Sequence, residues 1–253
     1  MNSIMRKREI MRELKKNGSV SVTELSEKLD VSSMTIRRDL IKFQEEGLIT
    51  IEHGGAVLNG GSLFEFNMSM KQSEYEEEKK RIARKCLDYI NDGDSIFLDA
   101  GTTANEIAKL LVDRDNLLVM TNSFLAANTL ASASGIKLLM CPGIFREKSM
   151  AVMGQITDEF ISDFKIDKLF LAVEGVDIER GVSVPDVMDG ATKKNLVNCS
   201  DKIICVSDSS KFGLSMFYTI CDLKDIDVMI TDNHLDEEIT NKFIQCGVDI
   251  KVV

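Results

Sequence analysis

The sequence predicts an α/β protein in which a small helical domain precedes a larger domain with a mostly parallel sheet. Residues 1–57 contain three short amphipathic helical patterns followed by a pair of short strands. From residue 74 onward, short apolar runs alternate with helical segments, as is typical of a parallel sheet covered by helices. The Gly-rich run Asn59-Gly60-Gly61-Ser62 separates the two patterns. We therefore expect domains over 1–57 and 74–253, joined by a linker over 58–73.

The first two predicted helices have clear ends. The apolar face of the first helix holds Ile4, Ile10, Met11 and Leu14. Gly18 then supplies the left-handed conformation at which helices commonly stop. The run Ser21-Val-Thr-Glu24 is a capping box, because the Ser side chain can accept from the amide three residues on while the Glu side chain reaches back. A second short helix is therefore expected to begin after Ser21.

A third helix follows the tight turn Asp30-Val31. Ser32 is a suitable N-cap, and Ile36, Leu40 and Phe43 recur at i, i+4 and i+7, so they share a face that must be buried. The other faces carry Ser33, Thr35, Arg37, Arg38 and Lys42. Polar and Arg residues near the start of a short helix are typical of a recognition helix that enters the DNA major groove. The alternative is an ordinary amphipathic helix with a solvated basic face.

The order helix, short helix, tight turn, helix is that of a helix-turn-helix. Leu48–Ile51 is predicted as a strand, and the run His53-Gly54-Gly55-Ala56-Val57 as a tight turn with a return strand. We therefore expect a winged helix-turn-helix that binds double-stranded DNA. His53 is expected either to contact DNA or to stabilise the turn.

The net charge of −10 belongs to the second domain. Residues 1–57 hold 10 Lys and Arg against 9 Asp and Glu, a charge of +1, which leaves 21 against 32, or −11, for the remainder. An acidic second domain repels DNA, so only the first domain is suited to contact it.

Length and composition exclude other classes of protein. No apolar run of about 18 residues and no secretory signal is present, so we expect a cytoplasmic protein without a membrane span. The cysteines lie far apart, mostly within apolar runs: Cys86, Cys141, Cys199, Cys205, Cys221 and Cys246. This spacing indicates reduced, packing cysteines, and we expect no disulfide, metal or cofactor.

The second domain is expected to contain seven strands. They are predicted over Ser95–Leu98, Leu117–Met120, Ile136–Cys141, Lys168–Val173, Lys202–Val206, Val228–Thr231 and Ile250–Val253. Each run is apolar on both faces, which favours a buried parallel sheet. Ligands of such sheets bind beyond the carboxyl ends of the strands, so the polar residues there are candidates for a binding site.

Three strand ends carry suitable groups. Asp99-Ala-Gly-Thr-Thr103 leads directly into a helix, whose free amides, two hydroxyls and positive dipole end can receive an anion such as a phosphate. Thr121-Asn122-Ser123 ends the next strand along the chain, and Asp208-Ser-Ser-Lys211-Phe-Gly213 ends the fifth. A simple helix cap at the first end and a surface turn at the last are the alternatives.

Four runs occur together in the first domain: SVTELSEKLDVS from Ser21, MTIRRDL from Met34, EEGLI from Glu45 and HGGA from His53. They resemble the DeoR family of bacterial transcriptional regulators. In the second domain, DAGTT from Asp99, TNS from Thr121 and DSSKFG from Asp208 are similar to the sensor domain of the same family.

The resemblance implies a DNA surface formed by Thr35, Arg37 and Arg38. It also implies a sensor domain similar in fold to ribose-5-phosphate isomerase, with a phosphorylated sugar as effector. The effector pocket is then expected to be lined by Asp99, Gly101, Thr102, Thr103, Asn122 and Lys211.

The sequence departs from the family pattern at three places. Relatives usually carry Arg two positions before the wing His, where this chain has Ile51, so one phosphate contact is expected to be missing. A family Gly-Gly is replaced by Pro142-Gly143, which stiffens a loop before Arg146, a further candidate anion partner. Ala191 stands where relatives carry Glu, which removes a carboxylate that would contact sugar hydroxyls.

The leading hypothesis is a repressor of a carbohydrate-use operon that a sugar phosphate releases. Because helix-turn-helix proteins commonly bind paired half-sites, we expect a homodimer or higher homo-oligomer held by the second domain. One alternative is a sugar-phosphate isomerase or lyase with an appended DNA-binding head, in which Asp99, Glu174 or Asp208 would be the base. Another is a regulator that senses protein or redox state through cysteine.

Overall fold

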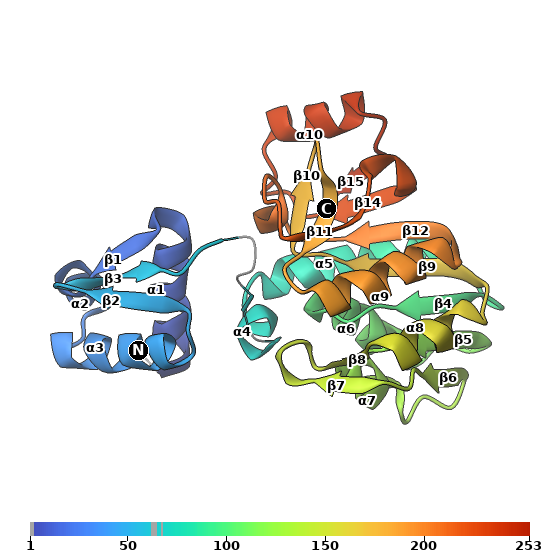
Figure 1. Cartoon of the computed structure of the whole chain (residues 1–253), viewed down its shortest axis with the longest axis horizontal. Helices are drawn as coiled ribbons and strands as arrows, with labels where there is room; N and C mark the ends of the chain where they lie inside the picture. Colours follow the sequence, from blue (N-terminus) through green and yellow to red (C-terminus); the bar gives the residue numbers. More distant parts are fainter. Residues whose placement is uncertain (1–2, 62–64, 67) are drawn as a thin grey trace. The chain divides into compact units, whose positions relative to one another are not determined.

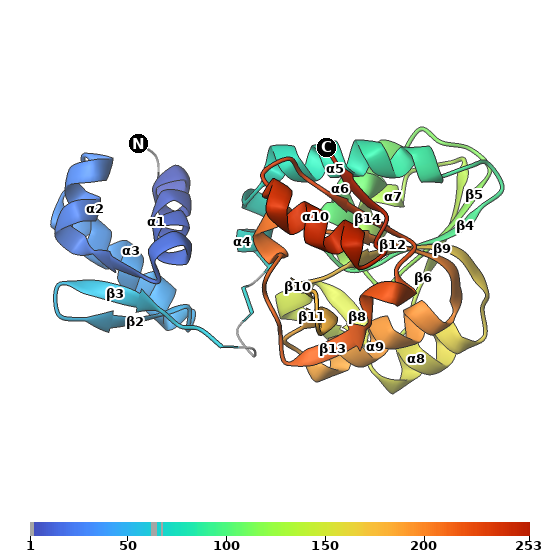
Figure 2. The ribbon, with the colours of Figure 1, turned by 90° about the horizontal axis from the view of Figure 1, so that it is seen from above.

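The computed structural model describes residues 3–61, 65–66 and 68–253, shown in Figures 1 and 2. The chain forms two compact units, residues 1–66 and 67–253. The side chain of Ile4, predicted on the apolar face of the first helix, and linker residues 62–64 and 67 lie outside the described residues.

The first unit is a winged helix-turn-helix. Its helices are α1 (Ser3–Asn17), α2 (Val22–Leu29) and α3 (Ser33–Glu45), and its strands are β1 (Ser19–Ser21), β2 (Ile49–Glu52) and β3 (Gly55–Leu58). The strands pair in the order β1-β3-β2. The sequence predicted only two of them. Gly55 makes the third possible, because a Cβ there would lie 2.1 Å from the Val20 carbonyl oxygen of β1.

Local chemistry sets the ends of these helices. The Ser21 hydroxyl accepts from the Glu24 amide at 3.5 Å, and the Ser32 hydroxyl accepts from the Thr35 amide at 3.3 Å, as the N-cap predictions required. Between α2 and α3, Asp30 adopts a left-handed conformation with φ of 51°. These caps confine α2 and α3 to short, well-defined segments joined by a tight turn.

The helices of the first unit enclose a small core. Its buried apolar residues include Ile10, Met11, Leu14, Val22, Leu25, Ile36, Leu40 and Phe43. A charge pair supports the core, since Arg6 Nε of α1 donates to Asp39 Oδ2 of α3 at 2.6 Å. Because Ile36, Leu40 and Phe43 are all buried, the predicted inner face of the third helix is confirmed.

The second unit is built on a seven-stranded sheet in which every neighbouring pair is parallel. Its strands are β4 (Ser95–Leu98), β5 (Leu117–Thr121), β6 (Ile136–Met140), β9 (Ile166–Ala172), β12 (Ser200–Val206), β14 (Val228–Thr231) and β15 (Ile250–Val252). They lie in the order β15-β14-β12-β9-β4-β5-β6. All seven predicted strands are present, within a few residues of their predicted bounds.

Helices cover both faces of this sheet (Figure 2). Helices α5 (Glu76–Cys86), α6 (Thr102–Leu111) and α7 (Phe124–Leu130) contribute to one apolar cluster, and α8 (Gln155–Ser162), α9 (Val187–Asn198) and α10 (Glu237–Gln245) to the other. Adjacent residues of β9 alternate between the clusters, because Leu169 and Leu171 belong to one and Phe170 to the other. The strands are therefore buried on both sides, as their continuous apolar runs predicted.

Smaller elements surround the sheet. Strands β7 (Ile144–Arg146) and β8 (Ala151–Met153) pair with each other, and β10 (Gly175–Asp177), β11 (Gly181–Val184) and β13 (Tyr218–Cys221) form a three-stranded sheet. The remaining helices are α4 (Met68–Ser73) and the short 3₁₀ segments Leu87–Tyr89, Glu147–Ser149, Ser209–Lys211 and Leu223–Asp225. Part of the predicted linker is thus helical. Among the described residues, no helix combines the length and apolarity needed to cross a membrane.

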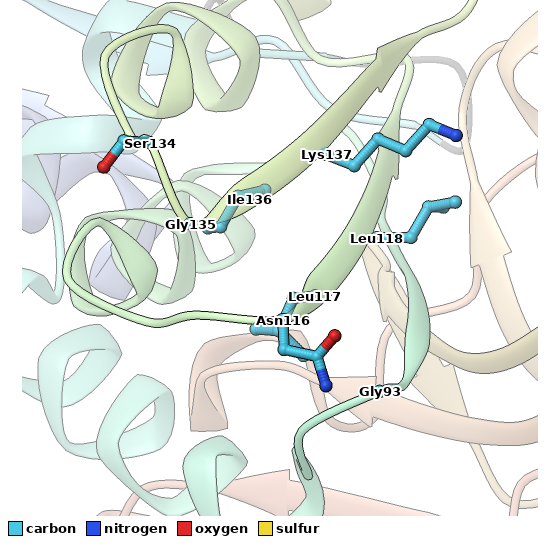
Figure 3. Close-up of a pocket in the computed structure, with 8 residues that line it drawn as sticks. All are labelled: Gly93, Asn116, Leu117, Leu118, Ser134, Gly135, Ile136 and Lys137. Atoms are coloured by element: carbon cyan, nitrogen blue, oxygen red, sulfur yellow. The ribbon is translucent and has the colours of Figure 1, made fainter.

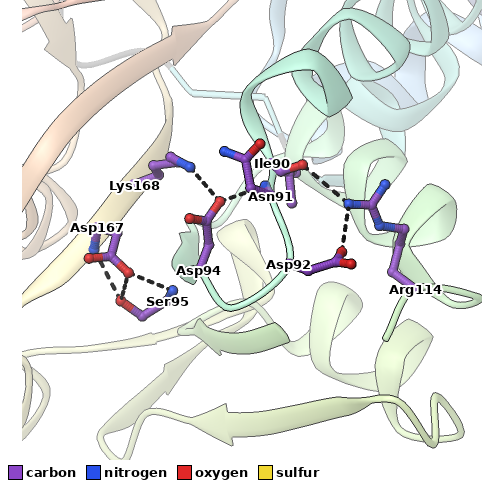
Figure 4. Close-up of polar contacts among 8 residues, drawn as sticks. All are labelled: Ile90, Asn91, Asp92, Asp94, Ser95, Arg114, Asp167 and Lys168. Carbon is purple, nitrogen blue, oxygen red and sulfur yellow. Dashed lines mark hydrogen bonds and ion pairs between the residues drawn. The ribbon is translucent and has the colours of Figure 1, made fainter. Parts of the chain in front are cut away.

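The amino ends of the strands are fastened by polar contacts (Figure 4). Asp94 pairs with Lys168 of β9, and Asp167 Oδ2 accepts from the Ser95 amide at 2.8 Å and from the Ser95 hydroxyl at 2.7 Å. An open pocket lies at this edge, lined by Gly93, Asn116, Leu117, Leu118, Ser134, Gly135, Ile136 and Lys137 (Figure 3). It lies at the opposite edge from the carboxyl ends, where ligands of open parallel sheets bind.

Candidate DNA interface and effector site

The outer face of α3 carries three exposed cationic side chains. Arg37, Arg38 and Lys42 are exposed, while Ile36 and Leu40 of the same helix are buried. In the described part of the chain, these three cationic side chains make no hydrogen bond or ion pair. Free guanidinium and ammonium groups on an exposed helix are suited to phosphate oxygens and to guanine edges.

The start of α3 adds polar and apolar groups. Ser33 is exposed, and the Thr35 hydroxyl lies 2.9 Å from the hydroxyl of Ser32, so Thr35 is oriented by the cap. Met34, which sequence reasoning did not select, is 65% exposed. A signal for it was present, since Met34 falls outside the buried stripe. An exposed apolar side chain at this position can pack against a thymine methyl group.

The wing turn presents His53, which is exposed beside Gly54 with φ of +81°. The preceding residues Ile51 and Glu52 are exposed as well, so the residues just before His53 carry no cation. The wing therefore offers fewer groups for a phosphate backbone than α3 does.

In the second unit, the predicted anion site lies at the start of α6. The helix begins at Thr102, directly after β4, and among the described residues no side chain caps its first turn. Gly101 is required for space, because a Cβ there would lie 2.5 Å from Ala172 Cβ of the neighbouring strand β9. Nor do the hydroxyls of Thr102 and Thr103 make a hydrogen bond within the described structure. The helix start thus keeps its donors available.

Asn122 lies beside this helix start, because β4 and β5 are neighbours with Leu98 opposite Thr121. Its side chain is fully buried, yet neither amide atom has a hydrogen-bond partner in the described residues. The residues on either side are engaged, since Thr121 Oγ1 donates to the Leu98 carbonyl at 2.6 Å and Ser123 Oγ accepts from the Ala126 amide at 3.2 Å. Buried amides are rarely left unsatisfied, so Asn122 is a candidate ligand contact.

Asp99, by contrast, is engaged by groups of its own chain. Its carboxylate accepts from the Ala100 amide at 2.7 Å, from the Ala172 amide at 3.0 Å and from Lys193 Nζ at 2.5 Å. These bonds join β4 to β9 and to α9. The Asp99 carboxylate was predicted to contact the effector, but it instead holds together the backbone and side chains that surround the site.

Sequence reasoning missed Lys193, whose side chain is only 2% exposed. Burial favours its neutral form, but Asp189 and Asp99 outweigh burial and raise the pKa of Lys193 above its ordinary value. Asp189 lies one helical turn earlier, 3.6 Å from Lys193 Nζ. The i, i+4 spacing of acid and base was the only local signal.

The two cations that the sequence predicted at the effector site, Lys211 and Arg146, are also paired with carboxylates. Lys211 Nζ lies 2.9 Å from Glu174 Oε2, and Lys71 Nζ of α4 lies 2.6 Å from Glu174 Oε1. Burial alone would raise the pKa of Glu174, but Lys211 and Lys71 outweigh it and hold that pKa well below its ordinary value. Arg146 Nη2 of β7 lies 3.2 Å from Asp186 Oδ2. Any anion bound here must rely on the α6 amides and neutral groups, or draw a lysine from its carboxylate.

The sequence also departs from the family pattern at Pro142-Gly143 and at Ala191. The Pro142 carbonyl accepts from Thr157 Oγ1 at 2.7 Å, and a Cβ on Gly143 would lie 2.1 Å from the same hydroxyl. The loop that carries them is thus held against α8. Ala191 is half-buried on α9, two residues before Lys193.

Known protein families match both units of the chain. The DeoR-like helix-turn-helix domain matches residues 6–61, and the DeoR C terminal sensor domain matches residues 74–233. The HTH-type transcriptional regulator YulB of Bacillus subtilis is 36% identical over 91% of this chain and 89% of its own length. The glycerol-3-phosphate regulon repressor of Escherichia coli K12 is 33% identical over 92% of each chain.

Two further similarities complete the comparison. The lactose phosphotransferase system repressor of Staphylococcus epidermidis is 32% identical over 92% of this chain and 94% of its own length. Among solved structures, ribose 5-phosphate isomerase A of Methanocaldococcus jannaschii overlaps 55% of each chain with a TM-score of 0.42 and 16% identity. The matching domain models and relatives show that this chain is a DNA-binding transcriptional regulator, not an enzyme, and that it belongs to the DeoR family.

Proposed function

We propose that this regulator represses a carbohydrate-use operon and that a phosphorylated sugar, bound at the carboxyl edge of the sheet, releases it. The proposal is supported by relatives named as repressors of the glycerol-3-phosphate regulon and of the lactose phosphotransferase system. The observation that carries the sensing half is the buried amide of Asn122, which has no partner among the described residues and lies beside the start of α6, where no described side chain caps the helix. We expect the protein in the cytoplasm, where a repressor meets its operator.

In this proposal, the outer face of α3 reads the operator. Arg37 and Arg38 bind guanine edges or phosphates, and Lys42 binds phosphate. Ser33 and Thr35 donate at the helix start, and His53 approaches the backbone from the wing. Because each unit of this kind reads one half-site, the functional species is a homodimer or higher homo-oligomer held by the second unit.

The main contacts to the effector are made by uncharged hydrogen-bond donors. Its phosphate is received by the amides of the first turn of α6 and by the hydroxyls of Thr102 and Thr103, where the helix dipole favours negative charge. Asn122 binds a sugar hydroxyl or a phosphate oxygen. Lys211 and Arg146 contribute only if the phosphate draws them from Glu174 and Asp186. Gly101 keeps the backbone close to the bound anion.

Repression then depends on a population shift. An effector that binds one arrangement of the DNA-binding domains more tightly than the other lowers the fraction that fits the operator. Effector binding at the carboxyl edge of the sheet thus lowers the affinity of the regulator for its operator.

The test is a gel shift with the DNA upstream of the gene for this protein, repeated with ribose 5-phosphate, fructose 6-phosphate, glycerol 3-phosphate and the matching unphosphorylated compounds. We expect at least one phosphorylated compound to weaken the shift while its unphosphorylated partner does not. Thr102→Ala with Lys211→Ala should leave the shift intact and blunt its release. If no phosphorylated compound changes operator affinity, the sensing half of the proposal is wrong.

A further inference from the structure

Helix α4 is the first element of the second unit, and it follows directly on the segment that leads from the DNA-binding domain (Figure 1). It contacts α6, whose start is the candidate anion site. Helix α4 is thus the nearest described helix of the second unit to the DNA-binding domain along the chain, and its contact with α6 places it to respond to what binds there.

Two lysines fasten α4 to the second unit. Lys71, on α4 itself, forms the 2.6 Å ion pair with Glu174 Oε1, and these side chains are 12% and 20% exposed. Lys79 of α5 donates to the carbonyl oxygens of Lys71 and Glu74, each at 2.5 Å. An ammonium group at the carbonyl end of a helix is favoured by the helix dipole. The tie thus consists of a charge pair and a cationic cap.

The carboxylate in this tie also belongs to the candidate effector site. Glu174 follows the end of β9, two residues after Ala172, which packs against Gly101. Its second oxygen pairs with Lys211, a predicted effector contact, at 2.9 Å. Glu174 thus pairs through one carboxylate oxygen with Lys71 of α4, the linker helix, and through the other with Lys211 of the candidate effector site.

We propose that Glu174 is the residue that couples effector binding to the linker helix, by holding Lys71 of α4 and Lys211 of the effector site at the same time. This rests on the proposed function. A bound phosphate attracts both lysines and repels the Glu174 carboxylate. The pair between Lys71 and Glu174 weakens, α4 loosens, and the DNA-binding domains lose the arrangement that fits the operator. Glu174 acts as a positioning residue for α4 in this scheme.

The test compares Lys71→Met with Lys80→Met in the full-length protein. Lys80 is a matched control, because it lies on α5 in pairs with Glu76 and Glu77 and takes no part in the tie. Without ligand, we expect Lys71→Met to speed hydrogen exchange of the α4 amides at least tenfold and to weaken operator binding at least fivefold. Ribose 5-phosphate, fructose 6-phosphate and inorganic phosphate should then change its operator affinity less than twofold. Lys80→Met should match the parent protein.

Lys71→Arg is the conservative variant, and it should restore both operator affinity and its response. Thermal unfolding of each variant checks that the second unit remains folded. If Lys71→Met keeps parental exchange in α4 and parental operator affinity, the coupling proposal is overturned. That result is distinguishable from failure of the proposed function, in which the parent protein itself ignores every phosphorylated sugar. The ligand-free comparison of Lys71→Met with Lys80→Met then still decides whether Lys71 fastens α4, and Glu174→Gln should speed exchange of the α4 amides in the same way if Glu174 is its partner.

Discussion

The two units use the same cationic residue types in opposite ways. On α3, Arg37, Arg38 and Lys42 point outward and have no partner among the described residues. At the carboxyl edge of the large sheet, Lys193 and Lys211 are each held within 3 Å of a carboxylate. A duplex offers phosphates along its whole length, so exposed free cations suit it. A small anion in a buried site is served by main-chain amides, because free buried cations would be costly to maintain.

The largest effect is expected from breaking the buried pair. Lys193→Met leaves the Asp99 carboxylate uncompensated, so we expect the second unit to lose about 3–5 kcal/mol of unfolding free energy. Urea denaturation should show this in the transition of the second unit, with the first unit unchanged. Lys194→Met is the matched control, because Lys194 is exposed, and it should change stability by less than about 0.5 kcal/mol. Equal stability of the two variants would show that the pair is not a buried charge pair.

The exposed cations should affect binding and leave stability unchanged. Arg37→Ala or Arg38→Ala is expected to weaken operator binding by about 1–3 kcal/mol, and to reduce the salt dependence of binding by about one unit of slope where a phosphate contact is lost. Titration of operator DNA at several salt concentrations measures both quantities. Lys28→Ala serves for comparison, since Lys28 is already paired with Glu13 and Glu9 and should matter less. An equal loss from Lys28→Ala would remove the distinction between free and paired cations.

The close contact between Gly101 and Ala172 at the start of α6 allows a test of the effector site. Gly101→Ala places a methyl group 2.5 Å from Ala172 Cβ, so the start of α6 must shift. We expect effector affinity to fall by about tenfold, or about 1.4 kcal/mol, while operator binding without effector is unchanged. Calorimetry with the active sugar phosphate measures this loss. Adding Ala172→Gly removes the opposing methyl group and should recover most of the affinity, whereas failure to recover would point to a cause other than packing.

The acid dependence of stability should reveal the charge pairs of Glu174. Its pKa is lowered in the folded protein, so its contribution to stability is present above the ordinary pKa of 4.5 and declines as pH falls below it. At pH 7 we expect Glu174→Gln to be less stable than the parent by about 1 kcal/mol, and this difference to shrink between pH 4.5 and pH 3. Unfolding free energies across that range decide the matter. A constant difference would mean that the Glu174 carboxylate gains nothing from Lys71 and Lys211.

The smallest effect is expected at the cysteines. Burial raises the pKa of Cys141 and of Cys221 to about 12, and Cys246 is exposed. A thiol reagent should therefore label Cys246 first in the folded protein, with little change in operator binding. Rapid loss of operator binding in step with labelling would instead support a regulator that senses redox state through cysteine.

The large sheet was predictable, and parts of its surroundings were not. Continuous apolar runs such as Ile136–Met140 identify a buried strand locally, without knowledge of its neighbours. Strands β7 and β10 are three residues long and are specified by their partners, so their own sequences give little signal. Strand β1 was hidden because Ser21, its last residue, is also the N-cap of α2.

The candidate sites show the same division. The amphipathic pattern of α3 was enough to assign Ile36 to the interior and Arg37 to the surface, which the structure confirms. Strand ends also indicated Gly101 and Asn122. The pairing of Asp99 with Lys193 joins residues far apart in the chain, so no local pattern contains it. The contacts of Glu174 with Lys71 and Lys211 were hidden for the same reason.

The freedom of the α3 surface has a consequence for how such regulators diversify. Side chains that make no hydrogen bond or ion pair in the described part of the chain can be exchanged without unfolding the domain, so new operators become accessible through a few substitutions at positions such as 34, 37 and 38. The sheet edge, where Asp99 and Glu174 each bind more than one group of the chain, resists that kind of stepwise change. Operator preference should therefore drift faster than effector preference, and exchanging α3 between relatives should retarget the regulator while its chemical trigger stays the same.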